Sequence, residues 1–398
     1  MNKSVSFLLG AGFSAPAGYP IGNKLGDRLL GSLDEKLVFH TDGSLIPPKN
    51  GNKVNLGFKN YYDGVFELCC DLMNLFKQKK SIDGFDYEEF FDYFNEKDSI
   101  VRKDIASLLN EKKYPRIENT EYDINQALFN MGKVYNELIS YYLVDRNKLS
   151  WYNESPSYEE YSSFISLLNF LKNENTINVH TLNHDVFFEY LIKANSLESD
   201  FSDGFVIENS PFYGVNNHRE SVNIEYYIGT YGTGVNLFKL HGSRDYRLFY
   251  SSEGTNDEVL VPSQYVKFRY GLADEIIKRT VDVNDEVTEE RFPFSYHGDF
   301  LSGINSKIKR YNEPILYGNL FRYFSENLKE AQALCIIGYG GRDSKVNEII
   351  LENFDYKNKR VIVVDPYPSD YVRDFVNNLQ GELIEVGIEG IDVNSFKF

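Results

Sequence analysis

The chain has 398 residues, a length that suits two or three domains of ordinary size. Hydrophobic residues make up 42% and charged residues 25%, which is typical of a folded globular protein and excludes disorder over most of the length. With 42 Lys and Arg against 59 Asp and Glu, the net charge is −17, which argues against a broad nucleic-acid-binding surface.

The first predicted element is a short buried strand over the apolar residues 4–9. The glycine-rich segment Gly10–Ala15 follows at once, and a helical pattern starts near Asn23. Strand, glycine turn and helix form the opening of a nucleotide-binding βαβ unit. The segment fits G-x-G-x-x-G/A, in which Gly10 allows the tight turn and Gly12 lets the backbone approach a pyrophosphate.

The alternative reading of this segment is a tight turn without a ligand. A dehydrogenase would carry an acidic residue after its second strand, about 20 positions later. The acidic candidates here, Asp34 and Glu35, lie where a helix passes into a loop. The chain therefore does not begin with a standard dehydrogenase unit.

The middle of the chain is predicted to be helical. Residues 40–60 read as a loop, and from about 61 to 172 the pattern is helical. Between 87 and 94 the aromatic residues recur at i, i+3, i+4 and i+7, which indicates an amphipathic helix, and 122–144 and 157–172 read likewise. We expect a helical insertion subdomain over 41–172, set between the two parts, 1–40 and 173–398, of one domain.

The second half alternates strands and helices. The strand-like runs are 177–182, 236–240, 333–337 and 360–364. Alternation of this kind predicts an α/β fold, a Rossmann-like parallel sheet with helices on both faces. Residues 250–310 are mixed in character and receive no assignment.

Polar clusters follow these strands, and ligands of open parallel sheets bind outside the carboxyl ends of strands. In the cluster Thr181–Asp185, Asn183 and Asp185 can both face a cleft. Asn183 can hydrogen-bond a ribose hydroxyl or hold a water, and Asp185 can bind a carboxamide or stabilise positive charge. The alternative is that one of them caps the following helix.

The next cluster is Leu240–Ser243, which contains His241. Histidine suits proton transfer near neutral pH, and Gly242 leaves room for a substrate beside it. The alternative is a structural histidine. The remaining histidines are weaker candidates for catalysis: His40, His180, His184, His218 and His297.

The last cluster is the glycine turn Gly338–Asp343, with Asp365 after the next strand. Such a turn can receive a phosphate on its backbone N–H groups. Asp365 is placed to bind an adenosine ribose, although Asp365-Pro366 can also be a simple turn.

The cysteines exclude some classes of site. Cys69, Cys70 and Cys335 form no C-x-x-C pair, which excludes a disulfide framework and a four-cysteine zinc site and fits a reducing cytoplasm. No run approaches the ~18 apolar residues needed to span a bilayer. We therefore expect a cytoplasmic protein that is not embedded in a membrane.

Four of these segments together resemble the sirtuin superfamily, whose members carry G-A-G-x-S, T-Q-N-x-D, L-H-G and a late glycine turn in this order. The matching segments are Gly10–Ser14, Thr181–Asp185, Leu240–Gly242 and Gly338–Asp343. The resemblance covers residues 1–30 and about 175–370. It implies a Rossmann-like NAD-binding domain that cleaves the bond between nicotinamide and ribose.

The resemblance also implies roles for single residues. Asn183 would position the nicotinamide ribose or an attacking water, Asp185 would contact the nicotinamide end, and His241 would be the general base. The residues that would line the NAD pocket, cradle its phosphates or bind its adenosine ribose are Ala11, Gly12, Phe13, Ser14, Gly338, Tyr339, Asp343 and Asp365.

The chain departs from sirtuin deacylases in several places. It lacks their zinc-binding C-x-x-C pairs, so no zinc is expected; Gly18–Asn23 replaces their G-I-P-x-F-R, and Leu182 replaces Gln. These features resemble the sirtuin-like domains of bacterial antiphage systems, which hydrolyse NAD to ADP-ribose and nicotinamide. We expect an NAD glycohydrolase with NAD as its substrate. The alternatives are a non-catalytic sensor of NAD or ADP-ribose and an NAD-dependent protein deacylase.

NAD hydrolysis without control would kill the cell, so we expect a gate. The helical block and the acidic surface are candidate interfaces for a homo-oligomer or a partner. The resemblance suggests a HerA-type ATPase or a phage protein as activator. The chain has no G-x-x-x-x-G-K-[ST] motif, so any ATPase would be a separate protein.

Overall fold

The computed structural model describes residues 3–35, 37–46, 58–80, 84–143, 158–216, 219–253, 259–268, 272–281, 285–292 and 298–397. The chain forms two compact units. The first, here called the Rossmann unit, comprises residues 1–19, 147–294 and 308–398, and the second, the helical unit, comprises 20–146 and 295–307. The helical unit begins earlier than the predicted insertion at 41–172, at residue 20, and its first segment ends earlier, at residue 146. The physical reason is packing: α2 (Gly22–Leu30) buries its leucines in the helical unit, and α7 (Ser162–Lys172) packs on the central sheet.

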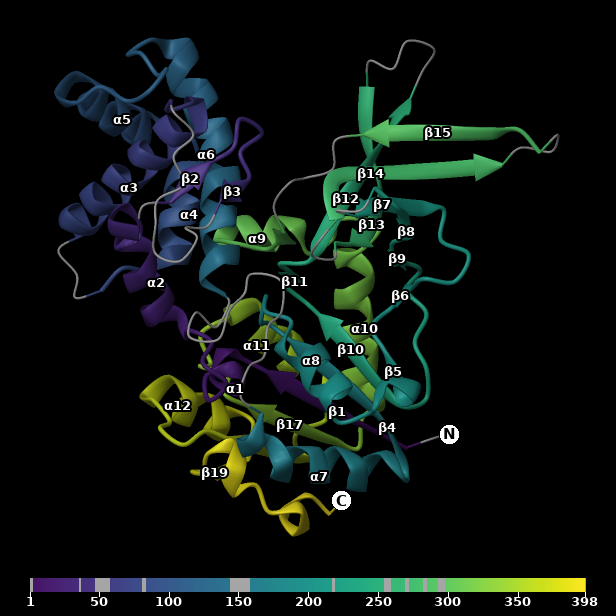
Figure 1. The fold of residues 1–398 in the computed structure, drawn as a ribbon. Coiled ribbons are helices and arrows are strands. Elements are labelled where there is room, and N and C mark those ends of the chain that lie inside the picture. Colours follow the sequence, from purple (N-terminus) through teal and green to yellow (C-terminus); the bar gives the residue numbers. More distant parts are fainter. Residues whose placement is uncertain are drawn as a thin grey trace. The chain divides into compact units, whose positions relative to one another are not determined.

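A seven-stranded parallel sheet forms the centre of the Rossmann unit (Figure 1). Its order is β19-β18-β17-β1-β4-β10-β5. The strands are β1 (Lys3–Leu9), β4 (Asn175–Thr181), β5 (Phe201–Ser202), β10 (Val235–Lys239), β17 (Ala333–Ile337), β18 (Arg360–Val364) and β19 (Glu382–Ile384). If β5 is left out and the other six strands are numbered 1 to 6 in chain order, the spatial order from β10 to β19 is 3-2-1-4-5-6. This is the doubly wound order, which reverses beside its first strand. The predicted α/β Rossmann-like fold is confirmed.

The two faces of β1 differ because side chains alternate along a strand. Val5, Phe7 and Leu9 join the apolar core beneath α7. On the other face the Ser6 hydroxyl donates to the carbonyl of Asn327 in α10 (Tyr317–Glu330) at 3.3 Å. Helices therefore cover both faces of the sheet. The remaining helices after strands are α8 (Phe187–Ala194), α11 (Ser344–Asn353) and α12 (Asp370–Asn378).

Two antiparallel sheets complete the Rossmann unit, with the orders β12-β13-β9-β6 and β15-β14-β7-β8. Their strands are β6 (Phe205–Val206), β7 (Phe212–Asn216), β8 (Ser221–Asn223), β9 (Tyr226–Tyr227), β12 (Tyr246–Glu253), β13 (Val259–Lys267), β14 (Leu272–Val281) and β15 (Val287–Phe292). Much of the stretch that received no assignment from sequence lies in these hairpins. Their register comes from pairing across the sheet rather than from a clear alternation along the chain.

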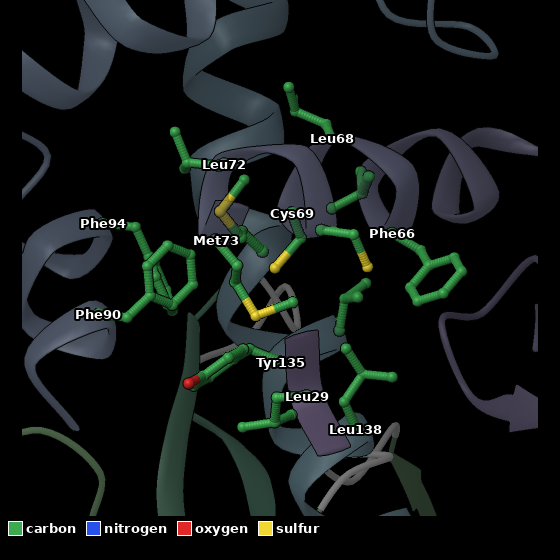
Figure 2. Close-up of a cluster of buried hydrophobic side chains, with 14 of the residues drawn as sticks. Leu29, Phe66, Leu68, Cys69, Leu72, Met73, Phe90, Phe94, Tyr135 and Leu138 are labelled. Atoms are coloured by element: carbon green, nitrogen blue, oxygen red, sulfur yellow. The ribbon is translucent and has the colours of Figure 1, made fainter. Parts of the chain in front are cut away.

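The helical unit contains α2, α3 (Tyr61–Lys80), α4 (Tyr87–Asn95), α5 (Ser99–Glu111) and α6 (Glu121–Tyr142). The amphipathic helix predicted at 87–94 is α4, and the Asp86 carboxylate caps it by accepting from Glu88 N and Glu89 N. Figure 2 shows Phe90 and Phe94 of α4 beside Tyr135 of α6 in the shared core.

The three cysteines are free and buried, Cys69 and Cys70 in α3 and Cys335 in β17. Burial raises the pKa of the Cys69 and Cys335 thiols, which keeps them protonated and unreactive. None of the helices in the described ranges combines the length and the apolar character that a membrane span requires.

Candidate functional site

The candidate site lies at the carboxyl ends of four neighbouring strands, β17, β1, β4 and β10. The strands end in register, since Leu9 lies opposite Ile337 on one side and Thr181 on the other, and Thr181 lies opposite Lys239. All four segments singled out in the sequence therefore leave the sheet at the same edge. This edge includes the point between β1 and β17 where the strand order reverses, the usual ligand crevice of such folds.

The two glycine turns at this point are packed against each other. Gly12 N donates to Gly338 O at 2.9 Å. Gly338 has φ +62°, and a Cβ built on it would lie 2.3 Å from Phe13 N, while one on Gly12 would lie 2.8 Å from Gly338 Cα. The glycines at 12 and 338 are therefore required by the contact between the two turns. The G-x-G-x-x-G/A pattern predicts for Gly12 the approach of a pyrophosphate, and the structure adds its contact with Gly338.

Free backbone donors remain beside these turns. Ala11, Gly12 and Gly340 are exposed, and a Cβ on Gly340 would meet open space. Among the described residues, no acceptor is present for the backbone N–H of Ala11 or of Gly340. Unpaired N–H groups on glycine turns at this edge are the donors that a phosphate group uses.

Phe13 lies on the core side of the first turn. Its ring packs with Tyr161, Phe164, Phe187 and Phe188 at centroid distances of 5.0–6.2 Å. The Tyr161 hydroxyl donates to Phe13 O at 2.6 Å. Phe13 therefore anchors the short helix α1 (Ala11–Ser14) to the core with its ring, and its part in an NAD pocket stays a prediction.

Asn183 joins the segment after β4 to the first glycine turn. Its Nδ2 donates to Gly10 O at 2.9 Å and to the Ser14 hydroxyl at 3.0 Å, and its backbone N donates to Thr181 Oγ1. Both amide hydrogens are therefore used within the protein. In the described part of the chain its Oδ1 accepts no hydrogen bond, so this oxygen is the group that Asn183 can offer to a ligand.

Asp185 is engaged at both its side chain and its backbone. Its Oδ1 accepts from Phe187 N at 3.0 Å, which closes a local turn just before α8, whose N-cap is Val186. Its carbonyl accepts a hydrogen bond from Lys239 Nζ. The structure therefore gives Asp185 a structural role at this edge, and its contact with nicotinamide stays a prediction.

Lys239 belongs to a buried network of charges that the sequence reasoning missed. Lys239 Nζ lies 3.0 Å from Glu189 Oε1, and Lys267 pairs with Asp203. Burial raises the pKa of Glu189. Burial also favours the neutral form of Asp245, but Lys267 and Lys239 outweigh it and lower the pKa of that carboxyl. The signal in the sequence was a lysine inside the apolar run 236–240.

His241 is held by two side chains from other segments. Its Nε2 lies 3.2 Å from the Tyr311 hydroxyl and 3.5 Å from Asp343 Oδ2. The Tyr311 hydroxyl in turn lies 3.4 Å from Asp343 Oδ2. The ring of His184, a weaker candidate from sequence, lies 6.2 Å from that of His241. Tyr311 was not predicted, because nothing in its local sequence marks it.

The last glycine turn is braced from within. Asp343 Oδ1 caps α11 by accepting from Val346 N at 3.1 Å, while its other oxygen faces Tyr311 and His241. The Tyr339 hydroxyl donates to Asn347 Oδ1 at 2.8 Å and accepts from Asp343 N at 3.1 Å. Tyr339 therefore braces the turn and Asp343 connects it to Tyr311 and His241, and the contact of both with a ligand stays a prediction.

Asp365 follows β18 at the same edge, and its Oδ1 accepts from Tyr367 N at 2.8 Å. This is the simple turn that was considered as the alternative to ribose binding. His180 lies fully buried in β4, and burial lowers its pKa to about 3. It is therefore a neutral core histidine. His218 and His297 lie outside the described residues.

No protein-family model matches the chain, and no curated protein matches it. Within the described ranges, no group of three or more His, Cys, Asp and Glu side chains could hold a metal ion. The functional argument therefore rests on geometry. The edge offers phosphate-binding donors, an amide oxygen at Asn183 and an imidazole at His241, which together suit a nucleotide substrate and proton transfer.

Proposed function

We propose that the chain is an NAD glycohydrolase that cleaves NAD to ADP-ribose and nicotinamide. One observation carries the proposal: the four segments that resemble sirtuin motifs leave four neighbouring strands at one edge of the sheet, beside the reversal of strand order. Segments separated by more than 300 residues in sequence meet there. A dinucleotide binds Rossmann-like sheets at this place.

The reaction makes modest demands on the protein. Nicotinamide leaves NAD as a neutral molecule from a cationic ring, so little acid catalysis is needed. The transition state has the oxocarbenium character of other glycoside cleavages. The protein must hold the ribose, stabilise positive charge on it and place one water. A neutral imidazole and an amide oxygen are suited to these tasks.

In this proposal the backbone N–H groups of Ala11 and Gly340 bind the pyrophosphate. The Oδ1 of Asn183 accepts from a ribose hydroxyl or from the attacking water. His241 takes up a proton from the ribose or the water. Ser14 acts on the site through its hydrogen bond with Asn183.

The biological role that follows is antiphage defence by depletion of NAD, which the resemblance suggests. Such an activity needs a trigger, and a homo-oligomer, a HerA-type ATPase or a phage protein are the proposed means of control. A non-catalytic sensor of NAD or ADP-ribose is the second candidate. The observation that favours it is the engagement of His241 Nε2 by Tyr311 and Asp343, which leaves this nitrogen occupied.

The test is nicotinamide release from NAD by the purified chain. Asn183→Ala and His241→Ala should abolish release. The matched controls are Asn178→Ala, which removes a buried amide from β4, the strand before Asn183, and His40→Ala, which removes an exposed histidine. Both controls should retain activity.

The outcomes separate the candidates. Release that needs an acetylated lysine peptide would mean a deacylase. If the purified chain binds NAD tightly without releasing nicotinamide, and the NAD level in phage-infected cells does not fall, the protein is a sensor. Release retained in both the Asn183 and the His241 variants would refute the proposed site.

A further inference from the structure

We propose that Arg342 binds a phosphate group of the nucleotide and thereby makes a negatively charged ligand a requirement of the site. The proposal rests on the proposed function, which places a dinucleotide at this edge of the sheet. Arg342 is exposed and lies in the glycine turn after β17. The turn and the elements that surround it, β18, α11 and α12, all belong to the Rossmann unit.

Arg342 differs from the arginines around it in sequence. A glutamate oxygen lies 2.6–2.9 Å from the guanidinium of each of four neighbours: Arg310, Arg322, Arg360 and Arg373. In the part of the chain that the structure describes, no carboxylate pairs with Arg342. Its guanidinium instead lies over the ring of Tyr371, 5.1 Å from the centroid. A guanidinium stacked on a ring keeps the N–H donors at its edge for a bidentate contact with phosphate.

Nearby charged groups do not compensate Arg342. Asp343 follows it in sequence, but its Oδ1 accepts from Val346 N and its Oδ2 faces Tyr311. Two other cations near the ends of these strands are paired, Lys345 with Glu348 at 2.8 Å and Lys239 with Glu189 at 3.0 Å. Among these three cations, Arg342 is the one whose charge no carboxylate of the described residues neutralises.

The backbone of the same turn favours the same kind of ligand. Within the described ranges, no acceptor is present for the successive N–H groups of Gly340, Gly341 and Arg342. The left-handed conformation of Gly341, with φ +72°, shapes the turn, and Gly341 O is fixed by a hydrogen bond from Asn347 Nδ2 at 2.8 Å. Successive free N–H groups in such a turn bind anions. The turn therefore carries both backbone donors and a guanidinium.

Tyr371 belongs to a rigid surface. A Cβ built on Gly341 would lie 3.1 Å from Tyr371 O, so the turn and the first residues of α12 are in contact. The Tyr339 ring packs edge-on against Phe375 of α12, with centroids 5.7 Å apart. The ring of Tyr371 remains 61% exposed and supports the guanidinium from one side. A side chain held in this way loses less freedom when a ligand binds.

The charges of the ligand and the protein give Arg342 its importance. The chain has a net charge of −17, which disfavours the approach of an anionic nucleotide. A cation at the ligand-binding edge offsets this repulsion where the nucleotide binds. Two phosphate groups of a nicotinamide dinucleotide offer the same chemistry to an arginine, the pyrophosphate of NAD and the 2′-phosphate of NADP.

The test measures the binding of three ligands to the full chain by calorimetry: ADP-ribose, ADP-ribose 2′-phosphate, and adenosine, which has no phosphate. Arg342→Gln removes the charge, Arg342→Lys retains it, and Tyr371→Ala removes the ring under the guanidinium. The matched control is Arg373→Gln, because Arg373 is an exposed arginine of α12 that pairs with Glu385. All three side chains are exposed, so the variants should fold.

We expect Arg342→Gln to lower the affinity for a phosphorylated ligand about ten-fold and to leave that for adenosine unchanged. Arg342→Lys should restore part of the loss, Tyr371→Ala should cause a smaller loss, and Arg373→Gln should bind as wild type. A loss for both phosphorylated ligands would identify the pyrophosphate as the partner of Arg342. A loss for the 2′-phosphate form alone would identify the 2′-phosphate.

Equal affinities of wild type and Arg342→Gln for both phosphorylated ligands would overturn the inference, as would an equal loss for adenosine or a wild type that binds neither phosphorylated ligand. An unchanged affinity in Tyr371→Ala would overturn the role of the stacking. Nicotinamide release separates this inference from the proposed function. Phosphate binding that depends on Arg342, without release in the purified chain or in infected cells, would refute hydrolysis alone. Release that is equal in wild type and Arg342→Gln at low NAD and NADP would refute the role of Arg342 alone.

Discussion

His180 should make the folded state lose stability in acid. Its Nε2 lies 3.1 Å from Asn327 Nδ2, an amide nitrogen that can only donate, so Nε2 accepts. The proton must then reside on Nδ1, which donates to Phe7 O at 3.1 Å. The ring also stacks on Phe238 at 5.0 Å. Only Nε2 can take up a second proton, and it does so at the cost of its buried hydrogen bond from Asn327, while burial disfavours the charged ring and lowers the His180 pKa.

The magnitude follows from the shift in pKa. The pKa falls from 6.5 to about 3 on folding. Below pH 6.5 the unfolded chain binds a proton at His180 that the folded protein does not, so stability is intact above this pH and falls as the pH decreases toward 3. The slope approaches about 1.4 kcal/mol per pH unit. Between about pH 7.5 and 5.0 the loss from this residue alone is about 2 kcal/mol.

The assay is the free energy of unfolding from urea titrations over this pH range. Other groups also titrate, so the informative quantity is the difference between wild type and His180→Gln, a side chain that retains an amide donor and acceptor but no titration. The wild type should lose about 2 kcal/mol more than the variant. The exposed His40→Gln should behave as wild type. Parallel pH profiles for wild type and His180→Gln would refute the reasoning.

Three further predictions concern stability, each measured by the midpoint and slope of urea unfolding. Gly338→Ala should lower the free energy of unfolding by about 2 kcal/mol or more, because its Cβ would meet Phe13 N at 2.3 Å, whereas Gly340→Ala should be nearly neutral; equal effects would contradict the packing of the turns. Lys239→Met should lower the free energy of unfolding by about 3 kcal/mol at neutral pH, because the buried Glu189 carboxylate loses the ammonium group paired with it. The loss should be smaller in mild acid, where Glu189 takes up a proton. A loss that does not change with pH would argue against this explanation. Tyr161→Phe should cost about 1 kcal/mol through the lost hydrogen bond to Phe13 O, and an unchanged midpoint would mean that the bond contributes nothing.

The local sequence pattern was sufficient to predict several strands of the parallel sheet and the helix at 87–94. Residues 333–337 and 360–364 are strands with these bounds in the structure, since continuous apolar runs between turns favour buried parallel strands. The glycine and polar segments after the strands could be placed at one edge because parallel strands share their carboxyl ends. The amphipathic helix at 87–94 followed from its 3.6-residue period.

Tertiary structure alone decided which groups meet. Tyr311 reaches His241 from a segment whose own sequence carries no functional motif, and Glu189 comes near Lys239 and Lys267 only when α8, β10 and β13 pack. Phe13 faces the core because aromatic side chains of α7 and α8 surround it. The strands within 250–310 also pair with strands much earlier in the chain, β14 with β7 and β13 with β9. Secondary structure follows from periodicity along the chain, whereas hydrogen bonds and ion pairs between distant residues arise only from packing.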